Sequence, residues 1–438
     1  MRIVQGIDAA KATLLRRARL GLGVASPSLL ARIKEVFGRE LSPEEAVAEI
    51  IAAVRSRGNA AVLEYTKRLD GVALASLEAT RQETQTAYGA VSQELLGALR
   101  LAAGRVRSFH EAAMSSYQRP VGELGLLVRP LERVGIYVPG GTASYPSTVL
   151  MTVVPAKVAG VEEVVVATPP RPDGTLPAAT LVAADIAGVD RLFKVGGAQA
   201  IAALALGTES IPRVDKVCGP GNIFVTLAKK QVYGLVDIDG LYGPTETVIV
   251  ADDSASLTLC AADLLAQAEH DEAASAILIA TSVGFAQAVS DEVERQLEGL
   301  ERGDIARAAL EHGGGIAVVE SVDEAVDLAN HYAPEHLCLM VQDARSYIGR
   351  VRHAGGLFIG ESSPEALGDY VAGPSHVMPT GGTARFASPL GVAQFLKDTA
   401  LVALSEAALK ELGPAAAAIA RAEGLTAHAR ALELRLGG

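Results

Sequence analysis

The pattern of hydrophobic and polar residues divides the chain into stretches of different character. From about residue 30 to 115, apolar residues recur at helical spacing, as at Leu30, Ile33 and Phe37. The letters SPEE at 42–45 form a capping box in front of the apolar run AVAEIIAAV. This stretch is predicted to be a helical scaffold, and the last 45 residues or so, which are rich in alanine, are also predicted to be helical.

Short β-rich runs alternate with helical runs from Gly135 to about Gly243, and again from Thr247 onward. The first stretch contains the strand-like runs GIYV, VEEVVVA, DRLFKV and DKVC, and the second contains TVIVAD, SAILIAT, GIAVVE, LCLMV and GGLFIG. Such alternation predicts βαβ units and parallel sheets. The pattern therefore indicates two similar α/β domains, the first interrupted by the second.

The charge balance argues against a polyanionic partner. The chain has 39 lysine and arginine residues against 51 acidic residues, a formal charge of −12, which disfavours binding to nucleic acid or to an anionic membrane. Its opening residues do not resemble a signal peptide, and no run reaches the roughly 18 apolar residues of a spanning helix. We expect a cytoplasmic protein that acts on a small molecule.

Three cysteines, Cys218, Cys260 and Cys338, lack any CxxC spacing, so neither a disulfide framework nor a thiolate zinc site is expected. Cys218 stands before Gly219, where a thiol nucleophile for aldehyde oxidation is one interpretation. The alternative is that all three are small buried hydrophobic residues.

Four glycine-rich turns lie near the predicted strand ends of the inner α/β stretch: PGGT at 139–142, PDGT at 172–175, VGGAQ at 195–199 and CGPGN at 218–222. Ligands of parallel sheets bind at the carboxyl ends of strands. No GxGxxG motif occurs, so the usual dinucleotide fingerprint is missing and ordinary βα turns remain an alternative.

Nitrogen and oxygen ligands for a metal are spread over three segments. Gln267 and His270 lie three apart on one predicted helix, and further candidates are Asp369 with His376 and Glu423 with His428. Two imidazoles, one carboxylate and one amide oxygen suit a catalytic zinc ion with open positions. Taken singly, each of these polar residues is equally consistent with a solvated side chain.

Glu335 and His336 follow Pro334, which ends the helix that begins with the capping box Ser321 to Glu324. A carboxylate and an imidazole side by side at the entry to a strand can act as a general base and acid. The alternative is a surface pair without a role.

Several strings together resemble the histidinol dehydrogenase family. They run in order from Gly135 to His428, over about 300 residues: GIYVPGGTASYPSTVLM, VGGAQAIAALALGTES, KVCGPGN, LLAQAEHD, NHYAPEHL, AGPSHVMPTGGTARF and AEGLTAHA. The resemblance implies an α/β fold of two incomplete Rossmann-like domains, one inserted in the other, with small helical extensions at both ends.

The implied domains are an amino-terminal extension (1–30), a discontinuous α/β domain with the metal and catalytic residues (31–134 and 244–388), an inserted NAD-binding domain (135–243) and a helical carboxyl-terminal segment (389–438). That last segment is expected to complete the active site of the partner in a homodimer.

The resemblance also implies a role for individual residues. Glu335 and His336 would handle protons, and zinc would be held by Gln267, His270, Asp369 and His428. NAD would contact Tyr137, Gln199 and Asn222, while Cys218 receives no role. Substrate contacts are expected from Thr245, His376, Glu423, His336 and the four zinc ligands.

The expected reaction is oxidation of L-histidinol through a bound aldehyde to L-histidine, with two NAD and one zinc ion per subunit. The alternative function is a paralogous zinc- and NAD-dependent dehydrogenase acting on another small alcohol, such as a sulfopropanediol. A protein that keeps the fold without catalysis is disfavoured by the complete set of expected ligand and proton-handling residues.

Overall fold

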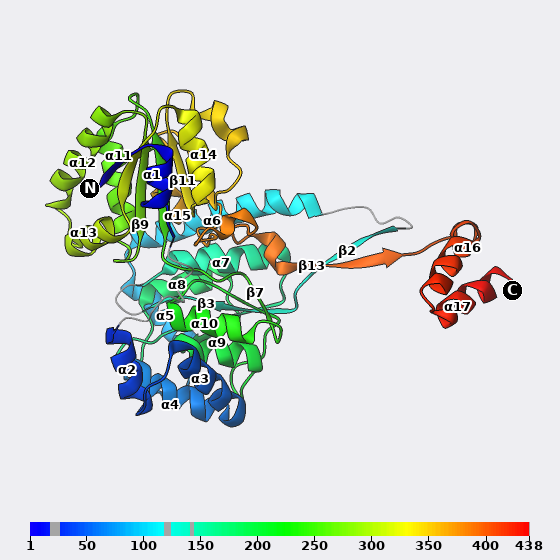
Figure 1. Cartoon of the computed structure of the whole chain (residues 1–438). Helices are drawn as coiled ribbons and strands as arrows, with labels where there is room; N and C mark the ends of the chain where they lie inside the picture. Colours follow the sequence, from blue (N-terminus) through cyan, green and yellow to red (C-terminus); the bar gives the residue numbers. More distant parts are fainter. Residues whose placement is uncertain (18–26, 118–123, 141–143, 438) are drawn as a thin grey trace.

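The computed structural model describes residues 1–17, 27–117, 124–140 and 144–437, and two parallel β-sheets form its framework (Figure 1). The six-stranded sheet has the order β1-β10-β9-β8-β11-β12 and the five-stranded sheet the order β5-β4-β3-β6-β7. The strands of the first are β1 (Ile3–Gln5), β8 (Glu246–Ala251), β9 (Ser275–Ala280), β10 (Gly315–Val318), β11 (His336–Met340) and β12 (Gly356–Ile359). Those of the second are β3 (Arg133–Tyr137), β4 (Glu163–Thr168), β5 (Arg191–Lys194), β6 (Lys216–Cys218) and β7 (Asp237–Ile238). The predicted strand runs all appear here, and the predicted α/β class is confirmed.

Helices cover both faces of the six-stranded sheet, because alternate side chains of each buried strand point to opposite faces. Leu278 of β9 packs with α11 (Leu257–Ala268), α12 (Val283–Leu297) and α13 (Gly303–His312). Its neighbours Ile277 and Ile279 pack on the other face with α14 (Val322–Tyr332) and with Ala10 of α1 (Ile7–Ala12).

The five-stranded sheet is enclosed in the same way. Val164 and Val166 of β4 face the layer of α5 (Arg81–Ala90), α6 (Gln93–Met114), α7 (Pro146–Ala159) and α8 (Ala178–Ala187). Val165 and Ala167 face the layer of α3 (Pro43–Arg57), α4 (Asn59–Asp70), α9 (Gly197–Leu206) and α10 (Ile223–Val232). Helix α2 (Pro27–Phe37) contacts α3.

This packing differs from the expected grouping of residues 31–134 with residues 244–388. Val47 and Ile50 of α3 and Tyr65 of α4 lie in one apolar cluster with Phe193 and Ile201 of the five-stranded body. Amphipathic periodicity specifies that a helix has an apolar face, but not which sheet covers it. The amino-terminal segment differs too, since Ile3–Gln5 pairs with β10 as an edge strand of the six-stranded sheet.

An antiparallel arm leaves the body. Strand β2 (Leu124–Pro130) pairs with β13 (Leu396–Val402), from Leu396 opposite Pro130 to Val402 opposite Leu124. Beyond β13, α16 (Glu406–Ala422) and α17 (Thr426–Leu436) pack against each other through Ala417, Ala420 and Ala429. Figure 1 shows these two helices apart from both sheets, at the end of the arm.

The expectation that residues 389–438 form a helical segment is therefore wrong for Leu396–Val402. These residues read LKDTALV, and the strand is stabilised by pairing with β2, more than 260 residues earlier in the chain. Local pattern alone does not reveal such a pairing. The remaining elements are α15 (Glu365–Tyr370) and the short turns η1 (Ser115–Tyr117), η2 (Ala344–Arg350), η3 (Thr383–Arg385) and η4 (Val392–Phe395).

The predicted capping box of α3 is confirmed on both sides. The Ser42 Oγ accepts from the Glu45 backbone N–H at 3.2 Å, and the Glu45 carboxylate accepts from the Ser42 N–H at 2.7 Å. At α14, Ser321 accepts from the Glu324 N–H at 3.2 Å, but the Glu324 carboxylate reaches the N–H of Glu320 instead. Among the described helices, none is both long and apolar enough to cross a membrane.

Replacing Ser42 with alanine is expected to lower the free energy of unfolding by about 1 kcal/mol, because the Glu45 backbone N–H at the start of α3 loses its acceptor. Urea unfolding followed by circular dichroism measures this loss. The control is Ser56→Ala, an exposed serine in the last turn of the same helix, which should change stability by far less. Equal losses in the two variants would contradict the capping role.

Candidate active site

The pair Glu335 and His336 lies at the entry to β11, as the sequence predicts. Helix α14 ends at Tyr332, Ala333 adopts a left-handed conformation with φ of 54°, and Pro334 leads into the strand. His336 is the first residue of β11 and pairs with Thr247 of β8. The pair therefore lies at the amino-terminal edge of the six-stranded sheet, opposite to the edge where ligands of parallel sheets usually bind.

Glu335 is buried and held by the start of β8. Its Oε2 accepts from the Thr245 hydroxyl at 2.6 Å and from the Glu246 backbone N–H at 3.0 Å. Burial raises the pKa of Glu335, while the nearby imidazole of His336 and these two hydrogen bonds oppose that rise. The carboxylate is fixed in position and its proton affinity is increased, which suits a general base.

His336 is surrounded by carboxylates. Its Nδ1 lies 3.8 Å from Glu335 Oε2, and its Nε2 lies 3.6 Å from Asp369 Oδ1. Burial alone disfavours the charged imidazolium, but Glu335, Asp369 and Glu365 outweigh that effect and raise the pKa of His336 to about 10. Nε2 is buried without a hydrogen-bond partner among the described residues.

Two further buried carboxylates, Glu246 and Glu365, belong to this centre and were missed in the sequence. Glu365 accepts from the Thr247 hydroxyl at 2.5 Å, and burial raises its pKa to about 7. Burial also raises the pKa of Glu246 to about 7, although Arg17 forms an ion pair with it. Glu246 directly follows Thr245, and Glu365 lies four residues before Asp369. No local sequence pattern indicates that either carboxylate is buried.

The predicted metal ligands are brought together only in part. Gln267 is buried at the end of α11 and its Nε2 donates to the Thr245 hydroxyl at 2.8 Å, while His270 is exposed two residues beyond the helix. Asp369 lies on α15 beside His336. Within the described ranges, no three histidine, cysteine, aspartate or glutamate side chains gather in a metal-binding arrangement.

His376 connects this centre to the five-stranded body. Its Nδ1–H donates to the Asp369 carbonyl at 2.8 Å, and its Nε2 accepts from the Thr148 hydroxyl of α7 at 3.2 Å. Burial lowers the pKa of His376, which favours the neutral ring that these two bonds require.

Glu423 and His428 are not near these residues in the single chain. Glu423 caps the end of α16 and His428 lies on α17, and both are exposed. These helices stand at the end of the arm (Figure 1).

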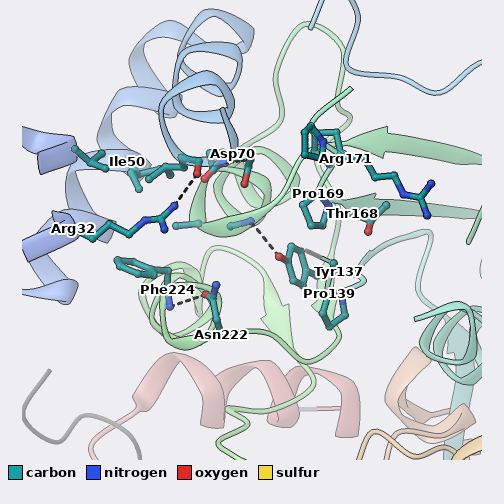
Figure 2. Close-up of a pocket in the computed structure, with 18 of the residues that line it drawn as sticks. Arg32, Ile50, Asp70, Tyr137, Pro139, Thr168, Pro169, Arg171, Asn222 and Phe224 are labelled. Atoms are coloured by element: carbon teal, nitrogen blue, oxygen red, sulfur yellow. Dashed lines mark hydrogen bonds between the residues drawn. The ribbon is translucent and has the colours of Figure 1, made fainter. Parts of the chain in front are cut away.

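The three predicted cofactor residues Tyr137, Gln199 and Asn222 line one cavity of about 830 Å³ (Figure 2). This volume is within the usual range of ligand pockets, about 300–1,000 Å³. The Tyr137 hydroxyl accepts from the Gly197 N–H at 3.2 Å, and the Asn222 side chain caps α10 by accepting from the Phe224 N–H at 3.0 Å.

All four predicted glycine-rich turns contribute to this cavity, through Pro139, Pro172, Gln199 and Asn222. Gly141 and Thr142 of the PGGT turn lie outside the described residues. The strand order reverses between β3 and β6. Tyr137 is the last residue of β3, and Asn222 follows β6. The cavity therefore lies at the switch point of the five-stranded sheet, as expected for a nucleotide site.

A buried ion pair stabilises the turn that carries Asn222. Lys229 is 1% exposed and forms an ion pair with Asp239, whose other oxygen accepts from the Gly219 N–H at 2.7 Å. Gly219 has φ of 113°, and a Cβ there would lie 2.0 Å from the Tyr137 carbonyl oxygen. Only glycine fits this close approach of two backbone segments.

Cys218 is 0% exposed, and burial raises the pKa of its thiol well above the ordinary value. A buried thiol with a raised pKa is a poor nucleophile, which favours the interpretation of Cys218 as a small hydrophobic residue.

Comparisons with known proteins agree with these features. A family model described as histidinol dehydrogenase matches residues 38–436. The histidinol dehydrogenase of Deinococcus radiodurans is 52% identical over 441 residues, covering 100% of both chains. That of Moorella thermoacetica is 55% identical over 407 residues, covering 91% of this chain and 96% of its own. The crystal structure of histidinol dehydrogenase from Elizabethkingia anophelis has a TM-score of 0.90 at 32% identity, and the match covers 100% of this chain and 98% of that one.

Replacing Lys229 with methionine is expected to lower the free energy of unfolding by about 3–5 kcal/mol, because Asp239 then remains buried without its counter-charge. The double variant Lys229→Met with Asp239→Asn should recover much of this loss, since the asparagine oxygen still accepts from Gly219. Urea unfolding of the three proteins checks both expectations. A double variant no more stable than the single one would show that the charge imbalance is not the cause.

Proposed function

The chain belongs to the histidinol dehydrogenase family, oxidoreductases of histidine biosynthesis, and we propose that it oxidises L-histidinol to L-histidine with two NAD and one zinc ion. The observation that carries this proposal is the convergence of Thr245, Gln267, Glu335, His336 and Asp369, from separate segments, on one buried centre. A cytoplasmic location, where amino-acid biosynthesis draws on the NAD pool, is part of the proposal.

The centre is chemically suited to a divalent cation. Glu335, Glu365 and Asp369 surround a single imidazole, and such an excess of buried negative charge is unfavourable without a compensating positive charge. The proposed ligands Gln267, His270, Asp369 and His428 offer the nitrogen and oxygen atoms that zinc accepts in catalytic sites. When bound, zinc would hold the amino and imidazole nitrogens of the substrate and fix its alcohol carbon in place.

His336 and Glu335 divide the proton transfers. In the first oxidation, His336 would be kept neutral by the positive charge of a cation bound among these carboxylates. It then accepts the hydroxyl proton while the carbon gives its hydride to NAD, which leaves a bound aldehyde and NADH. Glu335 then takes a proton from water as the water oxygen bonds to the aldehyde carbon, and protonated His336 returns its proton to the former carbonyl oxygen, which forms a gem-diol and leaves His336 neutral again. In the second oxidation the diol loses a hydride to a second NAD and a proton to His336, and the carboxylic acid is the product.

The cofactor occupies the cavity of the five-stranded body in this proposal. Tyr137, Gln199 and Asn222 lie at its wall, and the Thr148–His376 contact joins that body to the catalytic centre. Because NAD must be exchanged between the two oxidations, a site without the tight GxGxxG turn suits the reaction.

The arm supplies the remaining contacts in a homodimer. Leu412, Ile419 and Leu434 on α16 and α17 are 52%, 61% and 59% exposed, and a helical pair with such apolar side chains favours contact with another surface. We place Glu423 and His428 of each chain in the site of its partner, where Thr245, His376 and the zinc ligands contact the substrate.

Purified protein with zinc and excess NAD should form two NADH for each L-histidinol consumed, with L-histidine as the product. Absorbance at the NADH band and chromatography of the amino acid measure this ratio. Chelation should abolish turnover and added zinc should restore it. A ratio of one NADH, or turnover of other small alcohols only, would contradict the proposal.

Mixing two inactive variants tests the exchanged arm. His428→Ala removes the ligand of the arm and Glu335→Gln removes the base of the body, so each homodimer should be inactive. After unfolding and refolding together, mixed dimers contain one site with both native residues, and about a quarter of the wild-type activity should return for a symmetric exchange. If the arm served its own chain, no activity would return.

A further inference from the structure

One wall of the cofactor cavity carries a carboxylate without an evident structural purpose. Asp70 is the last residue of α4 and lines the cavity together with Arg32, across from Asn222 (Figure 2). It comes from the helical layer that packs on the five-stranded sheet, not from a βα turn. The reaction steps above do not use it.

The position of Asp70 is unfavourable for a negative charge. The carbonyl end of a helix carries partial negative charge, which disfavours an acidic side chain there. Burial raises the pKa of Asp70 to about 6, against the opposing charge of Arg32. Arg32 donates to the backbone carbonyl of Leu69 at 3.1 Å, so this hydrogen bond stabilises the end of α4 and does not reach the Asp70 carboxylate.

The neighbouring amide is also incompletely paired. Gln199 is 0% exposed, and its Nε2 donates to Asp70 Oδ2 over a long 3.5 Å. Its Oε1 is buried without a hydrogen-bond partner among the described residues. Buried polar atoms are rarely left unpaired in folded proteins, so this pair of side chains is arranged for a ligand with hydroxyl donors.

The chemistry of the pair fits a vicinal diol. A carboxylate with two oxygens accepts from two adjacent hydroxyl groups, as acidic residues do with the ribose of NAD in dinucleotide-binding folds. The catalytic centre lies on the other sheet, beyond α7 and the Thr148–His376 contact, while Asp70 belongs to the outer layer of α2, α3 and α4 (Figure 1). The ribose beside Asp70 is therefore the one farther from the nicotinamide.

We propose that Asp70, assisted by Gln199, binds the 2′- and 3′-hydroxyls of the adenosine ribose and selects NAD over NADP. This inference rests on the proposed function, since it requires a dinucleotide in the cavity. A 2′-phosphate would place negative charge against the Asp70 carboxylate and remove the hydroxyl donor. Arg32 and Arg171, which line the same cavity, would favour that phosphate once Asp70 is neutral.

The test is the variant Asp70→Asn, with NAD and NADP titrated into the zinc-loaded full chain by calorimetry and both cofactors assayed with L-histidinol. A hydrogen bond to a charged group typically contributes a factor of about 10–100 to binding. The affinity for NAD should fall by about that factor, while the affinity for NADP should stay equal or rise. The matched control is Glu35→Gln, which removes the same charge from an exposed position on α2 that does not line the cavity and should leave the NAD to NADP ratio unchanged.

A second probe separates recognition from a structural role. With 2′-deoxy-NAD, the wild-type protein should lose affinity and Asp70→Asn should lose far less, because the two changes remove the same interaction. Thermal unfolding without ligand should show Asp70→Asn to be at least as stable as the wild type, since an unfavourable charge is removed.

The outcomes distinguish this inference from the function on which it rests. Wild-type protein that binds NAD while Asp70→Asn leaves the NAD to NADP ratio unchanged would overturn the role of Asp70 alone. Equal losses for NAD and NADP would also overturn it, since they indicate a general disturbance of the cavity. Wild-type protein that binds neither dinucleotide would overturn both the inference and the proposed function.

Discussion

The crowding of buried carboxylates around one imidazole is the constraint on which the candidate active site depends. Glu335, Glu365 and Asp369 all raise the pKa of His336, and each carboxylate loses hydration when it is buried. The fold compensates through hydroxyl and backbone donors from the start of β8, among them Thr245 and Thr247. Because His336 pairs with Thr247 across β11 and β8, the strand register itself sets the distances within the centre.

In the proposed reaction, the two sheets contribute opposite edges to one site. The cavity lies at the carboxyl edge of the five-stranded sheet, where the strand order reverses, as in other nucleotide-binding sheets. Glu335 and His336, the pair proposed to handle protons, lie at the amino edge of the six-stranded sheet. His376 contacts both Asp369 and Thr148 of α7, so the proposed reaction depends on the relative position of the two bodies. A change far from either site that shifts one sheet against the other should therefore affect hydride transfer.

The helical layer of α2, α3 and α4 covers the five-stranded sheet and also lines the cavity. Its apolar face packs on that sheet through Val47, Ile50 and Tyr65, while its polar residues Arg32 and Asp70 reach the cavity. If the cavity binds NAD as proposed, a wall built from a separate segment gives few backbone contacts to a pyrophosphate, in keeping with the absent GxGxxG motif and with the proposed exchange of NAD between the two oxidations. The arm likewise holds His428, one of the predicted metal ligands, at its end within a single chain.

The sequence by itself determined the α/β class, the strands, the Ser42 capping box and the family, because alternating burial, caps and extended motifs are local properties of the chain. It also placed Tyr137, Gln199 and Asn222 on turns that prove to share one cavity. Only the tertiary structure decided which sheet the helices of residues 27–114 cover, the pairing of β2 with β13, and the burial of Glu246, Glu365 and Asp70. The physical reason is that periodicity records which side chains avoid water, whereas their partners are set by contacts between segments far apart in the chain.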